Sequence, residues 1–356
     1  MKENEFKQGN NQNIEIYDYK LLNNLTEDSA AYLLLDRTFI IFNSINGIIN
    51  LIYSNMEKSI VSYNLITNKK IIEIKNAHTD WVTNFNHFFD ENVKKDFVLS
   101  VSASDCNIKL WDINNYECLL NLNDIYNNGE IYSSCFLMFE NNNYIISSNY
   151  CRIYQQLKIF DFKGNLIKEI DEIKKKTIFI DTFYNKQDSK TYILTGNNGF
   201  ITSFDYNENK IKHIYDDKTD KEDHSIIIVW PLEYNDNNKN EIYKLIETCD
   251  DGFIRVWNFD TGILLKKIQF ENKLYLYGIC LLNNDYLFVG CSDFTIKVID
   301  LNEGKVVYQL IDSRCIDDII CITFINHPKY GKCLISQGNA GEQIKIWVNK
   351  KFLSEN

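Results

Sequence analysis

Short apolar, β-branched runs separated by polar turns extend along nearly the whole chain. The clearest case is Asn76 to Leu122, which reads NAHTDWVTNF, a polar loop, DFVLSVSASD, CNIKLWDINN and YECLLNL. Such runs are typical of strands, and they predict four, at about 81–86, 97–102, 107–113 and 117–122. One four-stranded antiparallel sheet cannot cover its own apolar faces, so this unit needs neighbours of the same kind.

The unit recurs along the chain. Its third run, an apolar-polar-apolar segment ending in an aromatic or apolar residue, occurs seven times at intervals of 42 to 53 residues. The runs end at Tyr63, Trp111, Phe160, Phe204, Trp257, Ile299 and Trp347. This period is typical of a radial array of four-stranded blades. We therefore predict an all-β fold, a seven-bladed β-propeller of four-stranded antiparallel blades.

The Ala77-His78 pair that opens the unit and the Trp111-Asp112 pair that closes its third run carry a family resemblance. With them, the sequence resembles the WD-repeat β-propeller family from about Ile14 to Trp347. The resemblance is strongest in the second and fifth copies. It implies one closed ring that docks partner proteins rather than catalysing a reaction.

The predicted organisation is a disordered stretch at 1–13, a single propeller at 14–350 and a tail at 351–356. The predicted blades cover about 38–75, 76–122, 131–170, 177–215, 224–270, 275–311 and 316–350. The last blade lacks a fourth strand, while the strand-like run IEIYDY at 14–19 belongs to no blade. We predict that this amino-terminal strand completes the last blade and closes the ring. Residues 21–36 fit either a short connecting helix or a strand.

Composition narrows the function classes. The net charge is −11, which argues against direct nucleic-acid binding and suits a basic protein partner. The ten cysteines form no C-x-x-C pair, and no zinc-ligand spacing appears. The amino terminus lacks a signal-peptide core, and no apolar run is long enough for a membrane span. We expect an intracellular, cytoplasmic protein, with a nuclear location left open.

The resemblance assigns several polar residues to a structural hydrogen-bond network. In the family, a His before the first strand meets an Asp in the second-to-third turn and the Trp of the third strand. Two copies hold such a set with the same His-to-Trp spacing of 33 residues, and a third copy keeps its Asp. These residues are His78, Asp105 and Trp111, then His224, Asp251 and Trp257, and finally Asp293.

The family's serine, two residues before the Asp, is replaced by Ala103 in the second copy and by Cys249 in the fifth. The network is therefore either incomplete or borrows a flanking serine. A His-Asp pair also occurs in catalytic sites, but such a pair needs a nucleophile or substrate within reach. Because the set recurs with one spacing and no nucleophile motif accompanies it, a structural role is favoured.

Partners of this family commonly dock on the face where the first strands begin and the second-to-third turns lie. Strand register places there Trp81, Ser104, Ile227, Asp250, Tyr277, Ser292 and Asp318. Trp81 fits equally an exposed anchor or a core residue. We predict a non-catalytic scaffold, without cofactor or metal, that acts as a monomer within a larger protein complex. The alternative is a ligand-binding or enzymatic propeller that uses its central channel.

Overall fold

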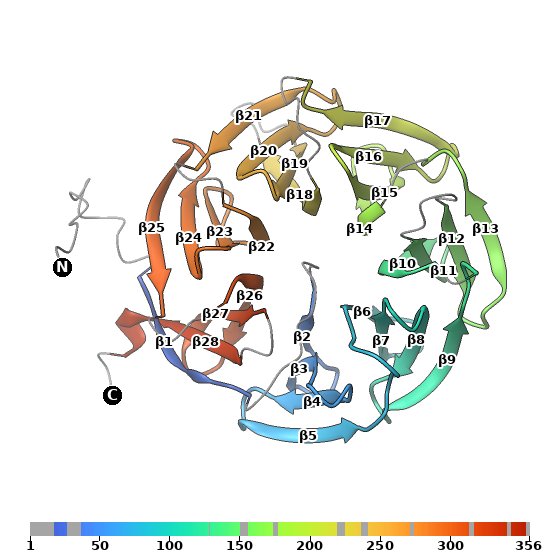
Figure 1. Cartoon of the computed structure of the whole chain (residues 1–356), viewed down its shortest axis with the longest axis horizontal. Helices are drawn as coiled ribbons and strands as arrows, with labels where there is room; N and C mark the ends of the chain where they lie inside the picture. Colours follow the sequence, from blue (N-terminus) through green and yellow to red (C-terminus); the bar gives the residue numbers. More distant parts are fainter. Residues whose placement is uncertain are drawn as a thin grey trace.

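The computed structural model describes residues 18–26, 37–127, 129–149, 156–173, 177–218, 225–235, 241–270, 274–312, 317–339 and 343–353. Within these residues, the strands β1 to β28 form seven four-stranded antiparallel sheets. The sheets are arranged radially around an axis, with each first strand next to the axis and each last strand at the rim (Figure 1). The predicted all-β, seven-bladed propeller is therefore confirmed.

Blades 1 to 4 follow one another along the chain, each with four consecutive strands. Blade 1 holds β2 (Phe39–Asn43), β3 (Ile49–Ser54), β4 (Ile60–Asn64) and β5 (Lys69–Ile74). Blade 2 holds β6 (Asn84–Asp90), β7 (Lys95–Ser102), β8 (Asn107–Asp112) and β9 (Glu117–Asn123). Blade 3 holds β10 (Ile131–Phe139), β11 (Asn142–Asn149), β12 (Leu157–Asp161) and β13 (Leu166–Ile170). Blade 4 holds β14 (Thr177–Asn185), β15 (Lys190–Asn197), β16 (Phe200–Asp205) and β17 (Lys210–Asp216).

Blades 5 to 7 complete the ring. Blade 5 holds β18 (Ile226–Asn235), β19 (Glu241–Cys249), β20 (Phe253–Asn258) and β21 (Leu264–Gln269). Blade 6 holds β22 (Leu276–Leu281), β23 (Tyr286–Cys291), β24 (Thr295–Asp300) and β25 (Lys305–Ile311). Blade 7 holds β26 (Ile319–His327), β27 (Gly331–Gly338) and β28 (Ile344–Asn349), followed by the 3₁₀ helix η2 (Lys350–Phe352).

Burial changes from the axis to the rim of each blade. In blade 1, every residue of the second strand β3 is buried, whereas the outermost strand β5 has no fully buried residue. A middle strand is covered by neighbouring blades on both faces and reads as a continuous apolar run. The blades approach closely near the axis, where a Cβ on Gly278 would lie 2.8 Å from the Ile320 carbonyl oxygen. Only a residue without a side chain fits there.

The amino-terminal strand closes the ring, as predicted, but its bounds differ from the prediction. It is β1 (Tyr19–Asn24), which pairs antiparallel with β28, so the predicted range 14–19 meets it only at its last residue. The reason is an apolar anchor, because the Tyr19 ring packs edge-on against Phe288 at 5.8 Å between ring centroids. Residues 14–17 lie outside the described residues, as do the predicted disordered stretch 1–13 and most of the 21–36 segment.

The first strand of blade 2 begins later than predicted. It was expected at about 81–86, but β6 starts at Asn84 and runs to Asp90. The preceding residues form a loop whose Thr79 backbone N–H donates to the Asp105 carboxylate at 3.0 Å. Side-chain capture of a backbone donor competes with the strand ladder, so pairing begins only after this loop.

Candidate partner-binding face

A buried hydrogen-bond chain joins the loop before the first strand of blade 2 to its second and third strands. The Trp111 indole N–H donates to the Ser100 hydroxyl at 2.8 Å, and the same hydroxyl lies 2.7 Å from His78 Nε2. On the other side of the imidazole, His78 Nδ1 lies 3.5 Å from an Asp105 carboxylate oxygen. The structure thus brings together three residues that the sequence singled out, and it adds Ser100. The serine lies five residues before Asp105, on β7, rather than at the position of Ala103.

The proton positions in this chain follow from its geometry. Burial lowers the pKa of His78, so its imidazole is neutral at pH 7. The Asp105 carboxylate facing Nδ1 favours the tautomer with hydrogen on that nitrogen, since two acceptors would otherwise face each other. Ser100 then accepts from Trp111 and donates to His78 Nε2. Every donor in the chain consequently points the same way, from the indole to the carboxylate.

The chain fixes the loop that carries Trp81. The Asp105 carboxylate also accepts from the Thr79 backbone N–H and hydroxyl, at 3.0 and 3.1 Å. Lys58, from the β3–β4 turn of blade 1, donates to the Thr79 carbonyl at 2.9 Å and lies 5.7 Å from the Trp81 ring centroid. Trp81 is half-buried, so part of its ring remains available at the surface. A rigid, partly exposed indole is the kind of side chain that anchors protein partners.

Blade 5 replaces this chain with a charged cluster. Arg255 is fully buried and donates to Asp217 at 3.1 Å, to Glu247 at 3.2 Å and to Asp251 at 2.5 Å. The Trp257 indole N–H donates to the other Glu247 oxygen at 2.9 Å. Burial raises the pKa of Glu247 to about 7. Glu247 thus has the role that Ser100 has in blade 2, and neither Glu247 nor Arg255 is among the residues predicted from the sequence.

The other predicted member of the blade 5 network, His224, lies outside the described residues. In blade 6, Asp293 accepts from Lys297 at 2.5 Å and from the Thr295 hydroxyl at 2.6 Å. No indole is available in that blade, because Ile299 stands at the position of the tryptophan. Asp293 therefore stabilises its own second-to-third turn rather than a chain through the blade.

A second aromatic group lies where blades 5, 6 and 7 meet the same face. Tyr275 is about half exposed, and its backbone N–H donates to the Ser292 hydroxyl at 3.0 Å. Phe294, in the next turn, is 42% exposed. Tyr277 is buried instead, and its hydroxyl donates to the Asp318 carboxylate at 2.8 Å. The exposed rings of this group are thus Tyr275 and Phe294, whereas the sequence had selected Tyr277.

The remaining predicted residues differ in accessibility. Ser104 is exposed in the β7–β8 turn. Asp250 is half-buried and accepts from the Ser225 backbone N–H at 2.7 Å, which fixes the entry to β18. Ile227 is only 4% exposed and lines a small pocket with Arg37, so it is not available as a surface anchor. The seven candidates therefore do not form one continuous exposed patch.

A comparison with protein-family models matches residues 69–112 to the WD domain, G-beta repeat. The matched segment runs from the start of β5 to the end of β8, and it contains His78, Asp105 and Trp111. Together with the seven four-stranded sheets, this match supports the WD-repeat propeller family. The chain is a seven-bladed β-propeller that contains a WD repeat. No curated protein matches the chain.

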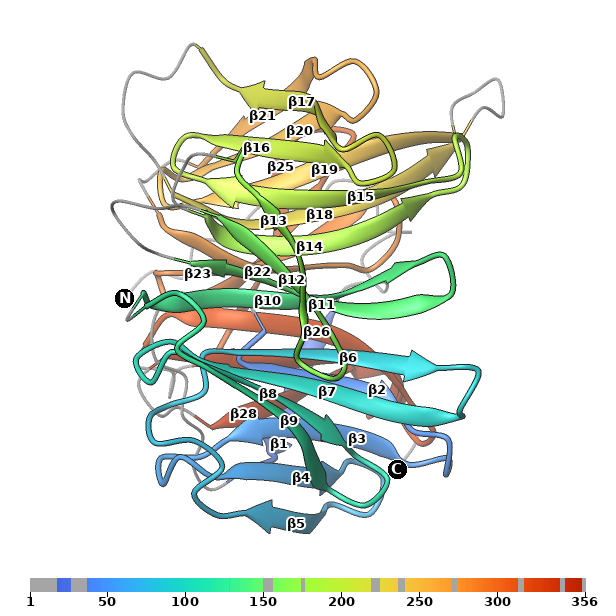
Figure 2. The same ribbon diagram turned by 90° about the vertical axis from the view of Figure 1, so that its right-hand side faces the viewer.

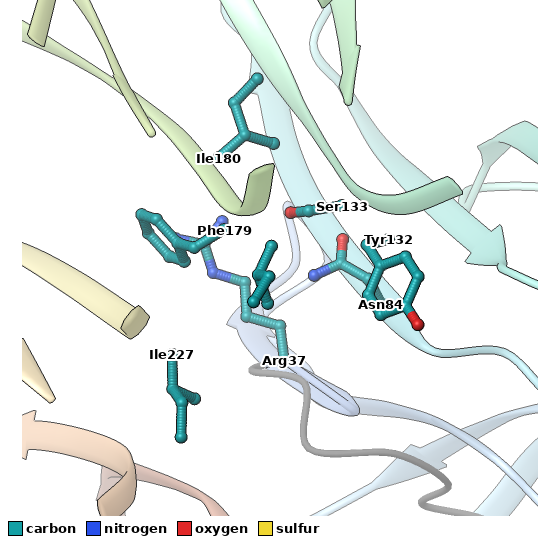
Figure 3. A pocket seen from close by; sticks show the side chains of 8 residues that line it. Arg37, Asn84, Tyr132, Ser133, Phe179, Ile180 and Ile227 are labelled. Atoms are coloured by element: carbon teal, nitrogen blue, oxygen red, sulfur yellow. The ribbon is translucent and has the colours of Figure 1, made fainter. Parts of the chain in front are cut away.

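A small space lies beside Arg37, among residues of the first strands or next to them. Arg37, which precedes β2, forms an ion pair with Asp181 on β14 and lies 5.8 Å from the Phe179 ring centroid. With Asn84, Tyr132, Ser133 and Ile227 around it (Figure 3), it leaves a space of about 10 Å³. That volume holds at most about one water molecule. Among the described residues, no group of three or more His, Cys, Asp or Glu side chains is placed to hold a metal ion.

The two ends of the WD-repeat propeller carry different loops. The first strands begin at one end, here called the first-strand face, and the second-to-third turns lie there too. The first-to-second turns, such as those after β6 and β10, project at the opposite face (Figure 2). Among the described helices, none is long and apolar enough to cross a membrane.

The described loops of the first-strand face carry more acidic than basic residues. The described loops at this end contain the basic residues Arg37, Lys58, Lys75 and Lys218. They contain many more acidic residues, namely Glu57, Asp80, Asp105, Asp124, Glu130, Asp171, Glu172, Asp217, Asp250, Asp251, Asp293, Asp312, Asp317 and Asp318. Several of these carboxylates bind cations within the fold, and acidic residues outnumber basic ones in the described loops of this face.

Proposed function

We propose that this WD-repeat propeller is a non-catalytic scaffold that docks a basic segment of a partner protein on its first-strand face. The observation that carries the proposal is the half-buried Trp81, held on a loop whose backbone is bonded to Asp105 and Lys58. A preorganised aromatic side chain loses little entropy on binding, so more of its contact energy appears as affinity.

The charge of the face supports a basic partner. Acidic loops attract a Lys- or Arg-rich segment and raise its association rate, and this steering weakens as salt is added. The exposed rings of Tyr275 and Phe294 offer further contacts for the apolar stems and cationic heads of such side chains.

The channel alternative has less support. A small-molecule site usually needs a cavity of several hundred Å³, far more than the space of about 10 Å³ beside Arg37. The Arg37 guanidinium is also engaged by the Asp181 carboxylate, so it is not presented to an incoming anion.

The test uses tagged wild-type protein and two tryptophan variants expressed in the native cells. Trp81→Ala should lower recovery of the partner about tenfold or more, because a buried aromatic anchor typically contributes at least 2 kcal/mol to binding. Trp230→Ala is the matched control, since Trp230 is 38% exposed but lies in the middle of β18. Partner recovery should also fall as salt is raised.

A thermal melt separates binding from folding in this test. Trp81→Ala should melt close to the wild type. If partner recovery is unchanged in Trp81→Ala, or if the two variants lose it equally, docking on the first-strand face is wrong.

A further inference from the structure

The seam where blade 7 meets blade 1 contains a pocket. Lysines surround it, whereas the first-strand face is rich in acidic residues. The pocket has a volume of about 220 Å³ and is lined by Leu22, Asn23, Leu25, Asn68, His327, Tyr330 and Ile346. This is the seam that β1 closes, so residues near the two ends of the chain meet there (Figure 1). A cavity of about 150 Å³ accepts a benzene ring, so this pocket can take one aromatic or leucine side chain.

A bulge in β1 shapes the pocket. The pairing of β1 with β28 shifts register between Leu21 and Asn23, which leaves Leu22 without an opposite residue. A bulge redirects the side chains beside it, and here both Leu22 and Asn23 contribute to the lining. Elsewhere along the strand, side chains alternate between the two faces of the sheet.

The lining combines an apolar floor with unused polar groups. Leu22, Leu25 and Ile346 supply the floor. At the rim, the Asn23 and Asn68 amides and the Tyr330 hydroxyl form no hydrogen bond to any described residue. Such groups can bond to the backbone of an extended peptide whose side chain fills the floor, which is how small apolar pockets fix a ligand's orientation.

The surroundings of the pocket are basic, unlike the rest of this acidic chain. The segments 44–48, 65–70, 327–332 and 350–353 meet at this end of blades 7 and 1, and they contain no Asp or Glu. They contain Lys69, Lys70, Lys329, Lys332, Lys350 and Lys351, of which Lys70 is paired with Glu73 and Lys350 with Asp18. Lys69 follows Asn68, and Lys329 lies between His327 and Tyr330, so both flank the pocket directly. Lys329 and Lys69 are exposed, and neither is in an ion pair with a described carboxylate.

We propose that this seam pocket binds an acidic peptide segment of a partner protein, with one apolar side chain in the pocket and carboxylates beside Lys69 and Lys329. The segment differs in charge from the basic partner of the first-strand face, so the two sites would select different partners. A nucleic-acid backbone has no apolar side chain that could fill the floor of the pocket. The net charge of −11 also repels nucleic acid at long range.

Fluorescence anisotropy with labelled probes tests the proposal on the full-length protein. The probes are the peptide EDDLFEED, its analogue EDDAAEED, the basic peptide KRKLFKRK and a single-stranded oligo-dT. EDDLFEED should bind, whereas EDDAAEED and oligo-dT should not. KRKLFKRK can bind the acidic first-strand face, so its binding should not change in the seam variants described below. Equal binding of EDDAAEED would mean that charge alone acts and would overturn the pocket. Preferential binding of oligo-dT, or KRKLFKRK binding that is lost in the seam variants, would overturn the choice of ligand.

Variants locate the binding. The double variant Lys69→Glu/Lys329→Glu should weaken EDDLFEED binding about tenfold, through two lost ion pairs and two new like-charge contacts. The control Lys163→Glu/Lys210→Glu makes the same charge change on exposed lysines of the same end in blades 3 and 4 and should bind normally. Asn23→Trp, which fills the pocket, should also weaken binding.

Trp81→Ala should bind EDDLFEED like the wild type, so that this site and the first-strand face can succeed or fail separately. If the Lys69→Glu/Lys329→Glu variant binds EDDLFEED as well as its control does, or if the wild type does not bind EDDLFEED, the seam pocket is not a peptide site.

Discussion

Three serines at equivalent positions of the second strand allow the cost of the buried hydrogen-bond chain to be measured. Ser100, Ser147 and Ser336 pair with a lysine of the third strand in the same register, and all three are fully buried. They differ in what their hydroxyls bind, so each Ser→Ala change removes a different number of hydrogen bonds from a similar environment.

The number of hydrogen bonds decides the expected magnitude. Ser100 has two, to Trp111 and His78, and Ser336 has one, from the Trp347 indole at 2.8 Å. The Ser147 hydroxyl has no side-chain or backbone partner among the described residues. A buried donor or acceptor left unpaired costs about 1–3 kcal/mol. We therefore expect Ser100→Ala to cost about 2–4 kcal/mol and Ser336→Ala about 1–2 kcal/mol.

Ser147→Ala should change the free energy of unfolding by less than about 0.5 kcal/mol, because nothing is left unpaired. The assay is urea unfolding followed by tryptophan fluorescence and far-UV circular dichroism, with the slope m compared across variants so that a midpoint shift reports stability. The reasoning is refuted if Ser100→Ala and Ser147→Ala unfold at the same urea concentration.

Two other changes test the charged cluster and the ring closure. Glu247 has a folded pKa of about 7, above the unfolded value of 4.5, so its proton stabilises the fold at low pH and this stabilisation is lost as pH rises through about 7. Urea midpoints of Glu247→Gln should therefore fall less between about pH 5 and pH 8 than those of the wild type; equal falls would contradict the assignment. A chain starting at residue 27 should melt well below one starting at residue 18, because it lacks β1 and the burial of Tyr19, worth about 3–5 kcal/mol. Equal melting temperatures would show that β1 does not hold the ring closed.

The seven-bladed architecture could be predicted from the sequence, because it depends on local patterns that repeat. Each third strand ends at an aromatic or apolar residue with a regular period, and the turns between strands are rich in Asn, Asp and Gly. An isolated strand-like run and an incomplete last blade were enough to predict closure by the amino terminus. The bounds of that strand, Tyr19–Asn24, depended on which residues pack against Phe288 and Phe324 in another blade.

The site was less accessible to sequence reasoning, because its members come from different strands and blades. Tyr277 and Ile227 lie on the predicted face by register, but only packing determines that both are buried while Tyr275 and Phe294 are exposed. Arg255 and Glu247 are each a charged residue within an apolar strand, which is a signal that the sequence contains. Asp217, which accepts from Arg255, comes from the preceding blade, and no local pattern indicates that contact.

By itself, the sequence determined the number of blades and their order, since these follow from its periodicity. Its resemblance to the WD-repeat family implied that His78, Asp105 and Trp111 belong to one network. Only the tertiary structure decided that Ser100 completes the chain, that Arg255 and Glu247 replace it in blade 5, and that lysines near both chain ends meet at the closure seam. The physical reason is that hydrogen bonds and charge depend on distances between residues far apart in the chain, which a local pattern does not contain.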